Sequence, residues 1–269
     1  MSQAVGAQIP SLRRFARALT GSQKSGDAYV AETLEAVLTD SSLIPLEADA
    51  KPRLYKLFLA MWNSLDVNHE DPPPPGLLAS DRNLQMISPG PRQAFLLTAL
   101  EGFSLKDTAQ VMLISEERCK RLIDEAAREM AEQGACDVLV IEDEPLIALE
   151  VTEIARSMGH TVKHVARTHR EAIEAVTKHR PSLVIADIQL ADGSSGLDAV
   201  DEILRSIDIP VVFITAYPER LLTGKKPEPT YLVEKPFRRE TVVALISQAL
   251  FFHAPRTSSR ATQSSRISV

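Results

Sequence analysis

The sequence predicts two domains of different class, an all-α N-terminal half and a C-terminal α/β half built on a doubly wound parallel sheet. At 269 residues the chain is long enough for two domains that each bury a core. Up to about residue 133 the apolar residues follow helical spacing, whereas after Gly134 short apolar runs alternate with amphipathic helical segments. Such alternation is typical of a parallel sheet with helices on both faces.

Three helices are predicted near the N-terminus. The first carries one apolar face and ends at the break formed by Thr20, Gly21 and Ser22. Asp27 is an N-cap residue type and is predicted to begin the second helix. The third starts near Pro52 and contains Trp62, which we interpret as a core residue.

A linker and a second helical domain follow. Residues 67–87 include four consecutive prolines, which cannot lie in a helix interior and favour an extended spacer. We therefore expect a first helical domain at residues 1–66 and a second at 88–133. Ser104 and Ser115 are placed to cap two short helices joined by a tight turn, which predicts a helix-turn-helix in the second domain.

The α/β half is predicted to span residues 137–252. Its expected strands are Val138–Ile141, Val162–Ala166, Leu183–Ile188, Val211–Ile214 and Tyr231–Val233. Residues 253–269 are rich in Ser, Thr and Arg without apolar periodicity, and we expect a disordered tail there.

The composition of the chain limits the classes of function that it can have. The chain is 44% hydrophobic and 25% charged with a formal charge of -6, which suits a globular protein and gives no support to a nucleic-acid binder of basic type. No leader or membrane-spanning stretch is evident, so the protein is expected in the cytoplasm. Cys119 and Cys136 lack metal-ligand spacing and are interpreted as reduced thiols. No catalytic Ser-His-Asp or Cys-His pattern is evident, so we do not expect an enzyme.

Polar residues gather where the predicted strands end. Glu142 and Asp143 follow the first strand, Asp187 closes the third, Thr215 closes the fourth and Lys235 follows the fifth. In an open α/β sheet, ligands bind outside the carboxyl ends of the strands, so these side chains should converge on one crevice. Thr215 would then be able to hydrogen-bond a phosphate oxygen.

Clustered carboxylates repel one another and are usually gathered to hold a hard cation, and Mg²⁺ suits a site that keeps waters and a phosphate. Asp143 and Asp187 would be direct ligands, Glu142 would act through water, and the backbone carbonyl of Gln189 would complete the coordination. Asp187 is then the predicted phosphoryl acceptor, with the metal and Lys235 stabilising the transferring group.

These residues, in this order, resemble the receiver domain of two-component response regulators, a flavodoxin-like fold. The resemblance covers Asp137 to Phe252 and implies a sensor histidine kinase or phosphotransfer protein as phosphoryl donor. The sequence departs from the common pattern at residues 189–196, a loop without the usual proline and one residue longer. Tyr217 sits two residues after the switch hydroxyl, and several prolines after it leave little room for a regular fourth helix.

The helical half resembles small extracytoplasmic-function sigma factors over residues 8–133. Region 2 is resembled by Ala18–Val37, with Leu19-Thr20-Gly21 and Ala31-Glu32-Thr33-Leu34, and by the helix containing Leu54-Tyr55. Region 4 is resembled by Pro91–Leu97, by Glu101-Gly102-Phe103-Ser104 and by the helix-turn-helix.

The charge of this half argues against DNA binding. A working sigma factor meets phosphates with basic side chains, but residues 1–136 carry 14 Lys and Arg against 18 Asp and Glu. The helix that would have to enter the groove of DNA starts with Glu116 and Glu117. A sigma-like module without a DNA surface, joined to a receiver with Phe-Ile-Thr-Ala-Tyr on its fourth strand, is similar to the PhyR family of general-stress-response regulators in alphaproteobacteria.

That resemblance implies partner switching. When Asp187 is phosphorylated, Thr215 and Tyr217 reorient, the receiver releases the sigma-like half, and that half sequesters a NepR-type anti-sigma factor, which frees the true sigma factor. A monomer that becomes a heterodimer with the anti-sigma factor is expected. The short connection from Glu132 to Cys136 favours domains that pack together. The alternative is a transcription regulator whose helix-turn-helix binds promoter DNA or RNA polymerase directly.

Overall fold

The computed structural model describes residues 3–44, 49–64, 89–131, 134–190, 192–218 and 229–253. The predicted linker at 67–87, the predicted tail beyond residue 253, and most of the proline-containing segment after Tyr217 lie outside the described residues. So do the first two residues of the connection between the halves, 132 and 133. Within the described part, no helix combines the length and the apolar character needed to span a membrane.

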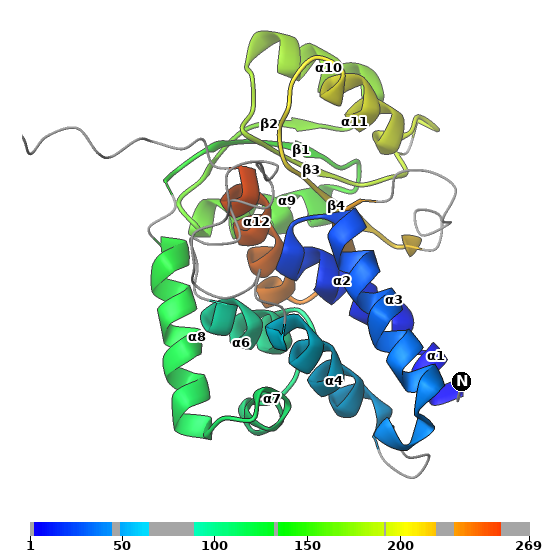
Figure 1. The fold of residues 1–269 in the computed structure, drawn as a ribbon. Helices are drawn as coiled ribbons and strands as arrows, with labels where there is room; N and C mark the ends of the chain where they lie inside the picture. Colours follow the sequence, from blue (N-terminus) through cyan, green and yellow to red (C-terminus); the bar gives the residue numbers. More distant parts are fainter. Residues whose placement is uncertain are drawn as a thin grey trace, which may run out of the picture.

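The N-terminal half is all-helical, as predicted (Figure 1). Its elements are α1 (Gln3–Gly6), α2 (Ile9–Thr20), α3 (Gln23–Thr39), the short 3₁₀ helix η1 (Ser41–Leu43), α4 (Ala50–Ser64), α6 (Pro89–Ala99), α7 (Leu105–Met112) and α8 (Glu116–Ala131). The break after the first predicted helix is confirmed, because α2 ends at Thr20 and is capped by Gly21 with φ of 67°, a left-handed conformation that glycine adopts without strain.

The prediction that Asp27 caps the second helix is wrong. Ser22 is the N-cap of α3, and its hydroxyl accepts a hydrogen bond from the Ser25 backbone N–H. Asp27 lies inside the helix, where its carboxylate accepts hydrogen bonds from Arg13 at 2.9 Å and Arg17 at 2.7 Å. Both residues are good cap types, and the ion pairs with the preceding helix α2, 10 and 14 residues earlier in the chain, decide how Asp27 is used.

The predicted helix-turn-helix is confirmed. The Ser104 hydroxyl accepts the Asp107 backbone N–H at 3.1 Å and begins α7. Ser115 does the same for Arg118 at 3.2 Å and begins α8. Between them Leu113 takes φ of 58°, which turns the chain sharply.

The C-terminal half is the predicted parallel α/β domain. Its strands are β1 (Asp137–Ile141), β2 (Thr161–Ala166), β3 (Leu183–Ala186), β4 (Val211–Thr215) and β5 (Tyr231–Glu234). They pair in the order β2-β1-β3-β4-β5, every pair parallel. The third strand ends earlier than predicted, at Ala186, so Asp187 is the first residue after it.

Helices cover both faces of this sheet. They are α9 (Pro145–Ser157), α10 (His169–Lys178), α11 (Gly196–Leu204) and α12 (Arg239–His253). Helices α10 and α11 lie on one face, with their own apolar cluster. The cluster on the other face includes α9 and α12 and continues into the helical half, where it contains Leu19, Leu96 and Leu97. The two halves therefore share one apolar core, with α12 between them (Figure 1).

The Asp27 ion pairs generate a stability prediction. Arg17 is 2% exposed, so Asp27→Asn would leave a buried guanidinium without its carboxylate and should lower the free energy of unfolding by about 1–3 kcal/mol. Burial alone raises the pKa of Asp27, but hydrogen bonds from Arg13 and Arg17 outweigh it and hold the pKa below the usual 3.8. The stabilisation is therefore fully present above about pH 4 and is lost as pH falls through the folded-state pKa.

Urea denaturation at pH 7 and at pH 3 measures both effects. The exposed Asp124 of α8 offers the control variant Asp124→Asn, which should leave the unfolding midpoint unchanged. An Asp27→Asn midpoint equal to wild type at pH 7 would contradict the prediction.

Candidate functional site

The predicted crevice lies where the parallel strands end side by side. Ile141 pairs with Ala186 in register, and the residues that follow are Glu142 and Asp187. The sheet order changes direction at β1, because β2 lies on one side of it and β3 on the other. Ligand sites of open α/β sheets form at such a switch point. Glu142 and Asp187 thus stand where a ligand is expected.

Asp187 is 8% exposed and held by its neighbours. Its backbone N–H donates to the Ile141 carbonyl at 2.8 Å, which continues the β1–β3 ladder. One carboxylate oxygen, Oδ1, accepts the backbone N–H of Ile188 at 2.5 Å. The other oxygen, Oδ2, accepts from the Lys235 ammonium at 2.7 Å. The carboxylate is therefore oriented by two independent elements, the loop after β3 and the end of β5.

Lys235 forms ion pairs with three carboxylates. Its Nζ lies 2.7 Å from Asp187, 2.9 Å from Glu142 and 3.1 Å from Glu144. Burial alone lowers the pKa of Lys235, but hydrogen bonds to Asp187 and Glu142 outweigh it and raise the pKa well above its usual range. The lysine therefore stays protonated at neutral pH.

One ammonium does not balance three carboxylates. Oxygens of Glu142, Glu144 and Asp187 lie within 4.8 Å of one another, an acidic cluster typical of a Mg²⁺ site in a receiver domain. Glu142 is only 3% exposed. Burial raises the pKa of its carboxyl group and Lys235 opposes that rise, with the raised value prevailing. The remaining negative charge is what a divalent cation would neutralise.

The structure distributes the predicted metal ligands unevenly. Glu142 and Asp187 are brought together, and Glu144, for which no role was predicted, joins them. Asp143 is half-buried, and its backbone carbonyl accepts from Arg167 at 3.3 Å; its carboxylate is not one of the three in the cluster. Glu144 belongs to the same acidic run after β1, and this run was the sequence signal that could have pointed to it. Only the position of Lys235 in the structure shows that Glu144 takes part in the cluster.

The two predicted switch residues lie at the end of β4 and just after it. Thr215 is fully buried, and its Oγ1 accepts the Tyr217 backbone N–H at 3.1 Å, whereas the Tyr217 side chain is 44% exposed. The Lys235 backbone N–H donates to the Thr215 carbonyl at 2.8 Å. Thr215 therefore lies between the acidic cluster and the exposed tyrosine.

The loop after Asp187 folds back on itself. Gln189, the predicted carbonyl ligand, pairs with Ser195 in an isolated antiparallel bridge, and its N–H points to Asp187 Oδ1 at 3.4 Å. Gly196 begins α11 and donates its N–H to the Ile188 carbonyl at 2.9 Å. A Cβ at Gly196 would lie 1.8 Å from the Asp187 carbonyl oxygen. Only glycine allows this loop to close beneath Asp187.

The helix-turn-helix keeps its shape without a basic surface. Glu116 and Glu117 occupy the first turn of α8, and Glu117 pairs with Arg121 at 2.9 Å along the helix. These acidic side chains are exposed at the end that would have to approach phosphates. Acidic side chains at this end would repel the phosphates of DNA.

Three family models match consecutive parts of the chain. They are the Sigma2 domain of PhyR over residues 5–59, the sigma-like domain of response regulator PhyR over 84–133, and the response regulator receiver domain over 138–247. Together with the acidic cluster and the parallel sheet, they define the class of the protein: a response regulator whose receiver domain follows a sigma-like helical half.

Relatives along the whole chain identify the family. The phyllosphere-induced regulator PhyR of Methylorubrum extorquens is 50% identical over 253 residues, which span 93% of this chain and 94% of that protein. The solved PhyR of Brucella abortus is 46% identical, covers 94% of this chain and 95% of its own, and superposes with a TM-score of 0.79. The anti-anti-sigma factor PhyR of Bartonella quintana is 45% identical, with 93% and 96% covered and a TM-score of 0.79. The chain belongs to the PhyR family.

The tight loop beneath Asp187 generates a prediction for Gly196→Ala. The new methyl group must displace the Asp187 carbonyl, which should lower the free energy of unfolding by about 2 kcal/mol or more. Gly6→Ala is the matched control, because no atom lies within 4 Å of a Cβ built there. Equal unfolding midpoints for wild type and Gly196→Ala in urea would refute this account of the loop.

Proposed function

We propose that this chain is a phosphorylation-controlled anti-anti-sigma factor: phosphorylation at Asp187 releases the sigma-like half, which then binds and sequesters an anti-sigma factor of the NepR type. The Bartonella quintana relative is described as an anti-anti-sigma factor and has also been solved in complex with the anti-sigma factor NepR. The observation that carries the proposal is the packing of α12 and β5 of the receiver against α2 and α6 of the sigma-like half.

The phosphoryl chemistry is proposed for the acidic cluster. A carboxylate oxygen of Asp187 attacks the phosphorus atom, the bond from phosphorus to the donor's leaving group breaks, and an acyl phosphate forms. Glu142, Asp143, Asp187 and the Gln189 carbonyl are the residues that would hold Mg²⁺, which neutralises phosphate charge when bound. Lys235 already contacts Asp187 at 2.7 Å and would contact a phosphate oxygen. A sensor histidine kinase or phosphotransfer protein would be the donor.

The two halves are joined by specific polar contacts at the start of α12. The Arg238 guanidinium donates to the Ala99 carbonyl at 2.9 Å, and the Thr241 hydroxyl donates to the same oxygen at 3.0 Å. Ala99 is the last residue of α6, where carbonyls lack helical partners. The receiver thus caps a helix of the sigma-like half.

Two further contacts extend this interface. The Arg92 guanidinium stacks over Phe251 at 4.5 Å and Phe252 at 4.9 Å, at the C-terminal end of α12. Arg17 of α2 donates to the Pro229 carbonyl at 3.2 Å, just before β5. The interface therefore runs from the entry of β5 to the end of α12.

A short route connects the proposed phosphoryl acceptor with this interface. Lys235 contacts Asp187 directly, and Arg238 follows only three residues later in the chain. A phosphoryl group adds up to about two negative charges beside Lys235, and Thr215 would turn from Tyr217 toward the phosphate. We infer that the end of β5 and the start of α12 then shift together, which weakens the contacts at Ala99.

We propose that the domains that carry these roles have the boundaries expected from the sequence. Residues 1–66 form the region 2-like domain, 67–87 the linker, 88–133 the region 4-like domain and 137–252 the receiver. The end of α8 at Ala131 and the start of β1 at Asp137 support the boundary between the region 4-like domain and the receiver.

Phosphoryl uptake is the first test of this function. Wild-type protein incubated with acetyl phosphate and Mg²⁺ should form a phosphorylated species on a phosphate-affinity gel, and Asp187→Ala or removal of Mg²⁺ should abolish it. Asp201→Ala, which removes an exposed carboxylate of α11, is the control and should label normally. Labelling of Asp187→Ala at the wild-type level would exclude Asp187 as the acceptor.

Partner binding is the second test. Beryllofluoride, a phosphoryl mimic, should strengthen binding of purified NepR to the full chain, and equal affinity with and without it would rule out the switch. Arg238→Ala should raise the affinity without beryllofluoride by up to about fivefold, because one interdomain hydrogen bond worth about 1 kcal/mol is lost. Arg239→Ala is the neighbouring control, since Arg239 donates to Ser157 within the receiver.

A further inference from the structure

An arginine at the end of β2 lies beside the acidic cluster that surrounds Lys235. Arg167 follows Ala166, the last residue of β2, and Ala166 pairs in register with Ile141 of β1. The Glu142 backbone N–H donates to the Ala166 carbonyl at 2.9 Å, so the chain just before Arg167 is tied to the start of the acidic run. Strand β2 therefore brings a guanidinium to the edge of the sheet that carries the proposed phosphoryl acceptor.

The backbone of Arg167 is also fixed from its C-terminal side. Thr168 is the N-cap of α10, and its hydroxyl accepts the Glu171 backbone N–H at 3.2 Å. The Glu171 carboxylate in turn accepts the Arg167 backbone N–H at 2.7 Å. Such a reciprocal arrangement at a helix start restricts the residues that lead into the helix. The exposed side chain of Arg167 thus projects from a firmly held backbone.

The Arg167 side chain reaches the acidic run itself. Its Nη2 donates to the Asp143 carbonyl at 3.3 Å, and Asp143 lies between two members of the cluster, Glu142 and Glu144. No carboxylate of a residue that the structure describes pairs with this guanidinium. A guanidinium has five N–H donors, so one carbonyl contact leaves enough of them for two oxygens of a phosphoryl group.

Neighbouring cations are already paired with carboxylates. Lys235, inside the cluster, contacts three of them, and Arg170, in the first turn of α10, pairs with Glu174 at 3.7 Å. A phosphoryl donor is an anion, so the excess of carboxylates in the cluster repels it as it approaches. A cation that no carboxylate neutralises reduces this repulsion at the point where the donor arrives.

We propose that Arg167 binds the phosphoryl group of the incoming donor and holds it beside the acidic cluster while Asp187 attacks. The phosphoryl oxygens accept hydrogen bonds from the guanidinium, and a carboxylate oxygen of Asp187 forms its bond to phosphorus. The bond from phosphorus to the leaving group then breaks, and the leaving group departs with the electron pair. Arg167 keeps its proton throughout. The inference rests on the proposed function and adds to it a residue that binds the donor.

Phosphoryl uptake by the full chain, with acetyl phosphate and Mg²⁺, tests this role. Arg167→Ala should lower the second-order rate constant of labelling about fivefold and weaken its dependence on salt, because a charge-assisted contact to the donor is lost. Arg167→Lys should restore most of the rate, since it keeps the charge. Phosphoramidate carries less negative charge than acetyl phosphate at neutral pH, so its rate should fall less. The Mg²⁺ concentration that gives half the maximal rate should not change.

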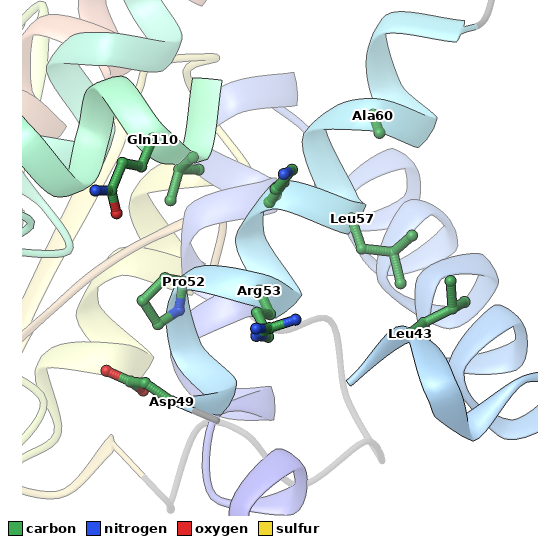
Figure 2. Close-up of a pocket in the computed structure, with 9 residues that line it drawn as sticks. Leu43, Asp49, Pro52, Arg53, Leu57, Ala60 and Gln110 are labelled. Atoms are coloured by element: carbon green, nitrogen blue, oxygen red, sulfur yellow. The ribbon is translucent and has the colours of Figure 1, made fainter. Parts of the chain in front are cut away.

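Two control variants remove the same charge at other exposed positions. Arg170→Ala acts one helical turn away on α10 and measures the long-range effect of charge on the donor. Arg53→Ala removes an arginine of the sigma-like half, and Figure 2 shows Arg53 on α4, at a groove that α4, α7 and η1 border. Both controls should label at close to the wild-type rate, and urea midpoints check that every variant is folded.

A labelling rate of Arg167→Ala equal to that of wild type, or a loss that Arg170→Ala matches, would overturn the proposal and leave the proposed function intact. Equal losses with both donors, together with a raised Mg²⁺ requirement, would also overturn it, because Arg167 would then act by holding the chain at Asp143. Absence of labelling of the wild type, or full labelling of Asp187→Ala, would instead contradict the proposed function.

Discussion

Burial of α12 on all sides holds the two halves of this molecule together. Val242 and every residue from Ala244 to Ala249 are buried, which a helix packed on one surface cannot achieve. One side of α12 belongs to the receiver core and another meets the helices of the sigma-like half, in a single apolar cluster. Separation of the halves would expose apolar surface to water, at a free-energy cost of about 25 cal/mol for each Å² exposed. Once the sigma-like half is released, a partner that covers this apolar surface again is therefore bound favourably.

The same interface buries a guanidinium group that is only partly hydrogen-bonded. Arg92 is 3% exposed, and burial lowers its pKa to about 10. It donates to the Leu19 carbonyl and stacks on two phenylalanines, but its Nε and Nη2 have no hydrogen-bond partner among the described residues. Incompletely satisfied buried groups cost free energy. The closed arrangement is thus less stable than its buried apolar area alone would suggest. A local change of charge can therefore shift the equilibrium between the closed and the released arrangement.

Most of the candidate site was predictable because strand ends in a parallel sheet meet at one edge. Apolar runs placed Glu142, Asp187, Thr215 and Lys235 there, and the structure brings Glu142, Asp187 and Lys235 into direct contact. The participation of Glu144 was not predictable, because its exposed side chain joins the cluster through the ammonium of Lys235, which lies 91 residues later in the chain. The role of Asp143 as a metal ligand stays a prediction.

The amino-acid sequence alone determined the class of each half, the helix caps at Ser104 and Ser115 and the edge of the sheet that carries the site, since periodicity and capping act over a few neighbouring residues. Only the tertiary structure decided that Asp27 pairs with α2 instead of beginning α3, that α12 is covered from both halves, and that α4, α7 and η1 border a groove. These features depend on side chains that belong to different helices or strands. Their contacts arise from packing and long-range charge, which no local pattern records.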